Sequence, residues 1–189
     1  MIASTIRNYV HAECQREGNP FGIDFFEQHV LAVADYGERL AQQLDADSEI
    51  VAISAYLHDI SAIQDSATVP VHNIRGAEIA VQYLAGLSYP PETIEKVRRC
   101  IVSHTCPLQI GEGTLEEVCL SNADAVSQIA RFPYFFYYAF IVRKFSYREG
   151  KEWLRALVER NWDKMIEPAR KLVKKEYLLA KECLADKAE

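Results

Sequence analysis

Six side chains in this sequence have the types and spacing of a metal site. Four of the five histidines and two aspartates can reach one place in a helical fold: His29, His58, Asp59, His72, His104 and Asp124. Four neutral imidazoles and two carboxylates suit divalent first-row metals such as Fe, Mn, Ni, Co or Zn, whereas Ca²⁺ and Mg²⁺ favour shells of oxygen. Six ligands exceed the four of a tetrahedral zinc site. They suit two metals bridged by a carboxylate, and Asp59 is the natural bridge because His58 anchors it at a helix end.

Each of these residues also has a simpler interpretation. A lone histidine on an apolar helical face, such as His29 or His104, is more often a hydrogen-bonded core residue than a metal ligand. Asp124 lies in a mostly apolar stretch and needs a buried partner there, which a metal supplies. The fifth histidine, His11, lies in a weakly patterned first helix, and we assign it to the surface.

The elements that position these side chains are helices. Apolar residues recur at helical spacing over residues 25–44, and a second, nearly all-apolar helix starts near residues 47–48 and ends near Asp59. An antiparallel hairpin of these two helices rises about 22 Å and returns about 15 Å. His29 and His58 then finish at nearby heights.

A second hairpin repeats this arrangement. A loop precedes a third helix over about residues 72–86, which begins at His72, and a fourth helix over about residues 90–104 ends at His104. A fifth helix begins at a capping-box sequence, Thr-Leu-Glu-Glu, and carries Asp124. No strand-like alternation appears. The sequence therefore predicts an all-α bundle with four histidines at one end.

Length and composition indicate the class of protein. The chain has 189 residues, of which 49% are hydrophobic and 25% charged, so we expect a single domain over residues 1–189. The longest apolar stretch, residues 134–142, is far shorter than the roughly 20 residues of a membrane span, and the start lacks a signal-peptide pattern. Five scattered cysteines without a C-x-x-C pair fit a reducing compartment. We expect a cytoplasmic protein with no membrane partner.

Charge is unevenly distributed along the chain. Residues 1–142 carry a balance of −10, whereas residues 143–189 carry +4. The acidic part disfavours nucleic acid as the main partner and suits a cation. In the basic segment, lysines and arginines alternate with glutamates along a helix, which indicates a solvated face rather than a phosphate-binding one.

An aromatic segment follows the fifth helix. Nine of the sixteen residues from 132 to 147 are aromatic, and helical spacing resumes at residue 151 with a break expected at Pro168. Such a cluster forms part of the core, a subunit interface or a pocket wall, so a homodimer is one of the alternatives. Because Pro133 is nine residues from Asp124, we predict that the segment closes over the metal end, with Tyr134 and Tyr137 in the pocket wall.

The order of these motifs resembles the HD-domain superfamily of metal-dependent phosphohydrolases. His29, the doublet His58-Asp59 and the distant Asp124 match its signature. Two further elements, beginning at His72 (H-x-x-x-G-A) and at His104 (H-T), look like those of the branch with a dinuclear centre, which includes symmetric diadenosine tetraphosphate hydrolases. The resemblance covers roughly residues 25–130.

The resemblance implies an enzyme that hydrolyses a nucleotide or another small phosphate ester with a metal-bound hydroxide. It implies two divalent transition metals, with Asp59 as the catalytic and bridging residue. One metal would be held by His29, His58, Asp59 and Asp124, and the other by His72, His104 and Asp59.

One departure from the family concerns substrate binding. Many members have Gly followed by Lys or Arg shortly after the doublet, where this chain has Ser61-Ala62-Ile63. The nearest arginines that could supply the missing phosphate-binding cation are Arg75 and Arg131, with an ordinary surface position as the alternative for each.

Two other functions are alternatives. Some HD-fold proteins with the same ligand order are mixed-valent diiron oxygenases, which would need iron at both positions and would consume oxygen with substrate. The other alternative is a non-catalytic sensor that binds a nucleotide. A sensor is disfavoured because a decayed site usually loses ligands, and none of the six is missing here.

Overall fold

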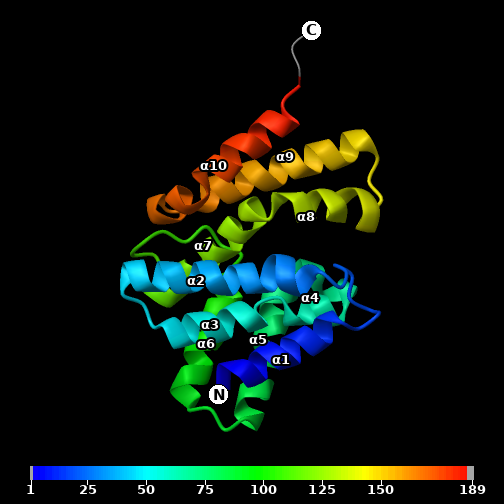
Figure 1. Cartoon of the computed structure of the whole chain (residues 1–189). Coiled ribbons are helices and arrows are strands. Elements are labelled where there is room, and N and C mark those ends of the chain that lie inside the picture. Colours follow the sequence, from blue (N-terminus) through cyan, green and yellow to red (C-terminus); the bar gives the residue numbers. More distant parts are fainter. Residues whose placement is uncertain (1, 187–189) are drawn as a thin grey trace.

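The computed structural model describes residues 2–186 of the chain, and every regular element in that range is a helix (Figure 1). The predicted all-α fold is therefore confirmed. The α-helices are α1 (Ile2–Cys14), α2 (Leu31–Leu44), α3 (Ser48–Leu57), α4 (Ile60–Gln64), α5 (His72–Gly86), α6 (Pro91–Ser103), α7 (Leu115–Ala130), α8 (Phe132–Tyr137), α9 (Tyr147–Lys164) and α10 (Glu167–Leu184). Three short helices of other types are η1 (Phe26–Val30), η2 (Ser66–Val71) and η3 (Tyr138–Val142).

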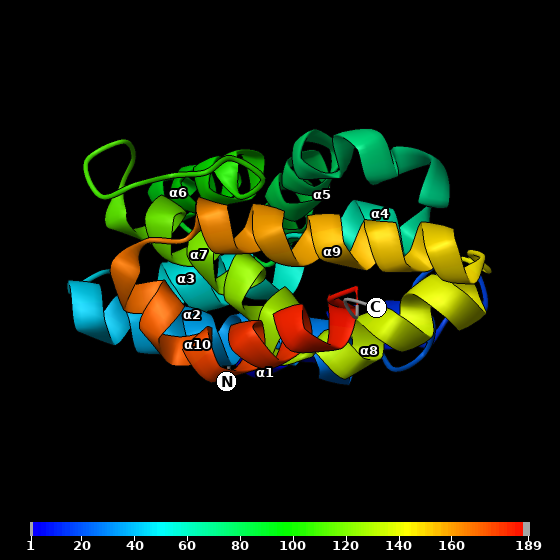
Figure 2. The same cartoon turned by 90° about the horizontal axis from the view of Figure 1, so that it is seen from above.

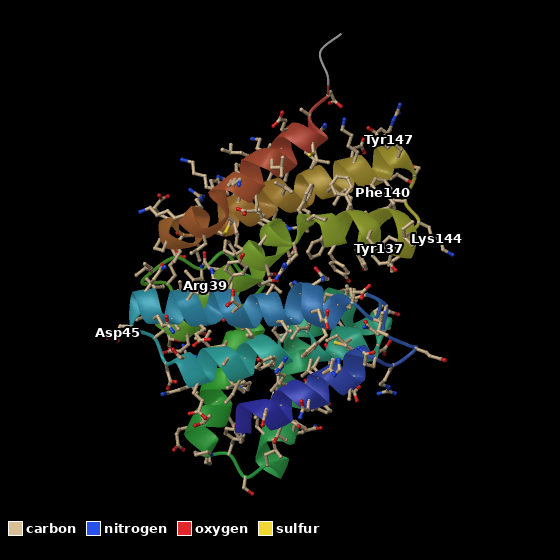
Figure 3. The ribbon with its side chains drawn as sticks, viewed as in Figure 1. Arg39, Asp45, Tyr137, Phe140, Lys144 and Tyr147 are labelled. Atoms are coloured by element: carbon tan, nitrogen blue, oxygen red, sulfur yellow. The ribbon has the colours of Figure 1, made fainter. Side chains whose placement is uncertain are left out.

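The first hairpin consists of α2 and α3. Asp45 ends α2 in the left-handed conformation at φ 58°, and the Asp47 side chain caps α3 by accepting hydrogen bonds from the next helical N–H groups. Figure 3 labels Asp45 at this turn. Gly37 lets the two helices approach closely, because a Cβ there would lie 2.9 Å from Cγ1 of Val51. The hairpin agrees with the sequence prediction.

The segment between this hairpin and the next differs from the prediction. The sequence predicted a loop before His72, but α4 and the 3₁₀-helix η2 fill most of that stretch. The helix predicted over residues 25–44 also begins differently. Its first turn is the π-helix η1, in which the Leu31 N–H reaches back to the Phe26 carbonyl. The extra residue in this wide turn sets the direction of His29.

The second hairpin, α5 and α6, packs with α7 around the same core. Helix α7 contacts α2, α3, α6, α9 and α10, and three quarters of its residues are buried. Its predicted capping box is present, with Thr114 and Glu117 exchanging hydrogen bonds. Because α7 lies at the centre, a polar side chain that it carries meets several other helices.

Helices α8, α9 and α10 form a layer over α7, at the top of Figure 1 and at the front of Figure 2. A second capping box, from Ser146 to Glu149, starts α9. Gly150 leaves room for the Phe140 ring, which lies between the η3 segment and α9 (Figure 3). The break expected at Pro168 occurs just before it, so that Pro168 sits in the first turn of α10, where its missing N–H is not needed.

One cluster of buried apolar side chains extends from Ile6 in α1 to Leu184 in α10. The single-domain organisation stays a prediction that this continuous core supports. None of the helices within residues 2–186 combines the length and the apolar character of a membrane span.

Candidate metal centre

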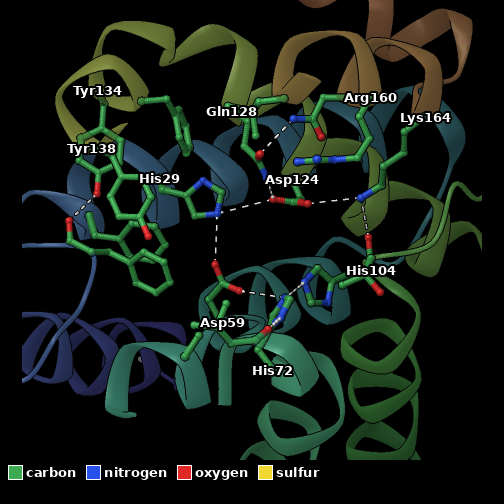
Figure 4. Close-up of a pocket in the computed structure, with 18 of the residues that line it drawn as sticks. His29, Asp59, His72, His104, Asp124, Gln128, Tyr134, Tyr138, Arg160 and Lys164 are labelled. Atoms are coloured by element: carbon green, nitrogen blue, oxygen red, sulfur yellow. Dashed lines mark hydrogen bonds and ion pairs between the residues drawn. The ribbon is translucent and has the colours of Figure 1, made fainter. Parts of the chain in front are cut away.

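The six predicted residues come from six separate helical elements and meet in one place, where Figure 4 labels all of them except His58. Three of the histidines lie at helix ends and one in the π turn, while one aspartate starts α4 and the other lies within α7. The residues are His29 in η1, His58 after α3, Asp59 before α4, His72 at the start of α5, His104 after α6 and Asp124 in α7.

The Asp59 carboxylate lies between histidines on both sides. Its Oδ2 atom is 3.4 Å from Nε2 of His29 and 3.2 Å from Nε2 of His58. Its Oδ1 atom is 3.5 Å from Nε2 of His72. The two oxygens therefore face different histidines, as a carboxylate that bridges two metal positions must.

The histidines approach one another in pairs through the same ring atom. Nε2 of His29 lies 3.2 Å from Nε2 of His58, and Nε2 of His72 lies 3.1 Å from Nε2 of His104. Two nitrogens bound to one metal at 2.0–2.1 Å are about 3.0–3.4 Å apart. The described residues thus contain two groups of close ligand atoms, one formed by His29, His58 and Asp59 and the other by Asp59, His72 and His104.

Backbone carbonyls fix which ring nitrogen is free to bind a metal in three of these histidines. Nδ1 of His58, His72 and His104 lies 2.8, 2.7 and 2.7 Å, respectively, from the carbonyl oxygen three residues earlier. Since a carbonyl can only accept, each Nδ1 carries a proton. The neutral ring then has its lone pair on Nε2, directed into the centre.

His29 reaches the same state through a side chain. The Ser127 hydroxyl donates its hydrogen to the Asp124 backbone carbonyl at 2.8 Å, so it accepts from Nδ1 of His29 at 3.0 Å. Four Nε2 lone pairs and the carboxylates of the two aspartates therefore converge. Lone pairs that face each other at 3.1–3.2 Å repel unless a cation lies between them. This donor set fits a divalent metal ion.

In the metal-free protein, a proton on His58 supplies part of the positive charge that these facing ligand atoms require. Burial lowers the pKa of His58, but the Asp59 and Asp124 charges and the hydrogen bonds to Asp59 and Ala55 outweigh burial and raise it to about 9. Burial and the positive charge of His58 lower the pKa of His104 to about 3. Burial raises the pKa of Asp59, but His58 and the other nearby histidines hold it well below its ordinary value. The metal-free centre therefore strongly favours the binding of a cation.

The Asp124 carboxylate has fewer close contacts with the histidines of the centre than the Asp59 carboxylate has. Its Oδ1 atom lies 3.6 Å from Nε2 of His29, and it belongs to neither close group. Its Oδ2 atom instead pairs with Nζ of Lys164 at 3.3 Å. Burial raises the pKa of Asp124, and the charge of Lys164 is the largest of the opposing effects that bring it below its ordinary value.

Lys164 is not among the site residues that the sequence predicts, because the charge pattern of the basic segment indicates a solvated face. Its side chain is buried, and Nζ donates to the His104 carbonyl at 2.7 Å. The signal that could have identified it is helical spacing. Lys164 lies seven residues after Leu157 and ten after Leu154, on the buried face of α9.

A pocket of about 710 Å³ opens onto the centre. Much of its lining is aromatic, with Phe21, Phe25, Tyr134, Phe135, Tyr138 and Trp153. The rings of Phe25 and Phe135 lie beside the centre, at centroid distances of 4.8 and 6.1 Å from the ring of His29. The predicted position in the pocket wall is confirmed for Tyr134, which Figure 4 labels with Tyr138. It is wrong for Tyr137, whose side chain is 44% exposed and lies outside the lining.

The structure does not bring the two predicted substrate-binding arginines into this pocket. Gly76 and Ala77 face the core, so Arg75 points to solvent, where it pairs with Glu78 at 2.8 Å. Arg131 is exposed at the end of α7. The cationic side chains that line the pocket come from the later segment instead, namely Arg143, Arg160 and Lys164.

Comparisons with known proteins agree with this geometry. The family model described as HD domain matches residues 26–129, just over half of the chain. A predicted HD superfamily hydrolase from an uncultured Thermotogales bacterium has 22% sequence identity and a TM-score of 0.65, over 96% of this chain and 88% of its own. YpgQ of Bacillus subtilis, solved in complex with ADP, has 18% identity and a TM-score of 0.69, over 96% and 93%. No curated protein matches the chain.

Proposed function

Because this chain belongs to the HD domain family, we propose that it is a metal-dependent phosphohydrolase that acts on a nucleotide or another small phosphate ester. The observation that carries the proposal is the position of Asp59. Its two oxygens face histidines of two separate ligand groups at 3.2–3.5 Å. This arrangement supports a centre with two metal positions that share one carboxylate.

In this proposal each metal position has its own histidine pair. His29, His58 and Asp59, with Asp124, would hold one metal, and His72, His104 and Asp59 would hold the other. The donor set suits Fe, Mn, Ni, Co or Zn. When bound, the metals supply a water of lowered pKa near neutral pH and neutralise charge on the phosphoryl oxygens. Asp59 is then the catalytic residue common to both positions.

The pocket supports a substrate with a phosphate at one end and a planar, apolar group at the other. Lys164 lies beside the centre, and Arg160 lies one helical turn earlier on α9. Trp153, eleven residues before Lys164, lies about 16 Å from it along the same helix. Lys164 and Arg160 would hold phosphate oxygens, and the rings that lie away from the centre, such as Trp153, would stack on a base. The ADP bound to YpgQ supports a nucleotide as this substrate.

The remaining expectations are consistent with such an enzyme. All five cysteines are free thiols, and three of them are buried, which supports the cytoplasmic location expected from the sequence. A small phosphorylated substrate fits a pocket of about 710 Å³ better than a nucleic acid does.

The test is a screen of nucleotides and phosphate esters under anaerobic conditions. We expect protein stripped with a chelator to be inactive, and protein reloaded with Mn²⁺ or Co²⁺ to release phosphate or pyrophosphate. The Asp59→Asn variant should be inactive with either metal. If the reloaded parent hydrolyses none of the panel, or if Asp59→Asn is as active as the parent, the proposal fails.

A further inference from the structure

Helix α9 reaches the candidate metal centre with two polar side chains, although it lies beyond the family match, which ends at residue 129. Asn161 and Lys164 are 3% and 8% exposed and lie one turn apart on the buried face of α9. Buried polar side chains are stable only with hydrogen-bond partners. Lys164 contacts Asp124 itself, and Asn161 contacts a residue that is hydrogen-bonded to Asp124.

Lys164 holds one oxygen of Asp124. Its Nζ lies 3.3 Å from Oδ2 of Asp124 and donates to the His104 carbonyl oxygen at 2.7 Å. The ammonium group therefore joins the middle of α7 to the end of α6. Figure 4 shows this side chain reaching between the two residues.

Asn161 supports the other oxygen of Asp124 through an intermediate side chain. Nδ2 of Asn161 donates to Oε1 of Gln128 at 3.0 Å, and Nε2 of Gln128 donates to Oδ1 of Asp124 at 2.9 Å (Figure 4). Gln128 lies one turn after Asp124 on α7. A carboxylate oxygen has two lone-pair sites, so Oδ1 keeps one site free on the side of His29.

The register of α9 against α7 is fixed next to these contacts. The backbone N–H of Ile166 donates to Oδ1 of Asn122 at 2.7 Å, and the Asn122 amide donates within α7 to the Val118 carbonyl at 2.9 Å. Asn122 is fully buried. Because this anchor lies two residues after Lys164, it holds the end of α9 in place at Asp124.

We propose that Lys164 and Asn161 are positioning residues that fix the rotation of the Asp124 carboxylate. Lys164 keeps Oδ2 away from the metal position, and Asn161, acting through Gln128, directs Oδ1 toward it. Asp124 then binds metal through one oxygen only, which leaves a coordination site open. This inference rests on the proposed function, in which Asp124 is a metal ligand.

The test uses Co²⁺, whose visible spectrum reports the number and arrangement of its ligands. We expect the spectrum of the Co²⁺-loaded protein to change in both Lys164→Met and Asn161→Leu, because the freed carboxylate rotates and binds differently. Asn161→Leu, which changes no charge, should also weaken Co²⁺ binding by about tenfold in a competition with a chelator. Lys171→Met makes the same change as Lys164→Met on the exposed face of α10 and should leave both readouts unchanged.

A double variant tests whether Asn161 acts through Gln128. If it does, Asn161→Leu combined with Gln128→Leu should weaken Co²⁺ binding no more than Gln128→Leu alone. This cycle keeps the test valid if Lys164→Met fails to fold. Parent-like spectra and affinities in both single variants would overturn the inference and leave the proposed function intact. A parent that binds no Co²⁺ would overturn both.

Discussion

Gly76 in α5 lies against the backbone carbonyl of His58, so closely that a Cβ at Gly76 would be 3.0 Å from that oxygen. This contact brings the first turn of α5 against the end of α3. His72, four residues before Gly76, can then reach Asp59. Gly76, the glycine of the H-x-x-x-G-A element that begins at His72, thus allows the close packing that brings His72 to Asp59.

We predict that Gly76→Ala lowers occupancy of the metal position formed by His72 and His104. The added methyl meets a backbone oxygen that cannot move freely, so α5 must shift, at a cost of about 1–3 kcal/mol in stability. Elemental analysis and thermal unfolding measure the two effects. Gly86→Ala in the same helix meets nothing within 4 Å and should keep full occupancy and parent stability or slightly more. Equal occupancy in the two variants would contradict the prediction.

Removing the shared carboxylate should affect both metal positions. We expect Asp59→Ala to lose both metals and His72→Ala to lose one, because Asp59 faces both histidine groups and His72 only one. Elemental analysis of the purified proteins gives the metal content per chain. His11→Ala, an exposed histidine outside the centre, is the matched control. Full occupancy in Asp59→Ala would show that Asp59 is not a ligand.

The stability of the metal-free protein should peak near pH 6.5. His58 has a pKa raised to about 9, so between about pH 6.5 and 9 the folded protein keeps a proton that the unfolded chain has released. The free energy of unfolding therefore falls as the pH rises through this window. Below about pH 6.5 the unfolded chain protonates His104, whose folded pKa is about 3, and stability falls again.

Melting temperatures of chelator-treated protein at pH 5, 6.5 and 9 check this profile. His11→Gln should keep the parent profile. A melting temperature that is constant or rises from pH 6.5 to 9 would rule out a protonated His58 in the metal-free centre.

Arg160 should act on substrate and not on the metals. Its side chain lines the pocket and makes no ion pair or hydrogen bond within the described part of the chain, so it is available for a phosphate. We expect Arg160→Gln to raise KM about tenfold or more, as loss of one charge-assisted contact does, with unchanged metal content. Arg148→Gln, exposed at the start of α9, should behave as the parent. Identical KM values for the two variants would exclude the role.

Tyr138 should influence the choice of base. Its ring lines the pocket with Trp153 at a centroid distance of 5.9 Å. We predict that Tyr138→Ala changes the ratio of kcat/KM between nucleotides of different bases, because stacking area is lost. Tyr137→Ala removes a neighbouring ring outside the lining and should leave this ratio unchanged. If Tyr138→Ala slows all substrates equally, the ring contributes to packing and does not select the base.

The sequence predicts that the six residues lie close together because the patterns that define the helices and their turns involve only neighbouring residues. Caps and helical spacing define the hairpins, and a hairpin returns His58 to the level of His29 without further information. The side on which Arg75 emerges depends on the packing of Gly76 against another helix, which no local pattern reveals.

The residues that were missed depend on contacts over long stretches of chain. Lys164 meets Asp124 across 40 residues and His104 across 60. Both pairings require α9 to fold back over α7, and the charge pattern of α9 alone resembles that of a solvated helix. The π turn that directs His29 has no sequence marker either.

The most direct test of the central claim is the origin of the oxygen atom added to the product. The best substrate of the screen is converted by the metal-loaded protein in water enriched in ¹⁸O, and in parallel under ¹⁸O₂ in ordinary water. A phosphohydrolase places one ¹⁸O from water on the phosphorus that is attacked, in free phosphate, pyrophosphate or the nucleoside phosphate, and reacts equally well without oxygen. An ¹⁸O atom from O₂ bound to carbon in the organic product, with no label from water on any phosphorus, would contradict the account and identify an oxygenase.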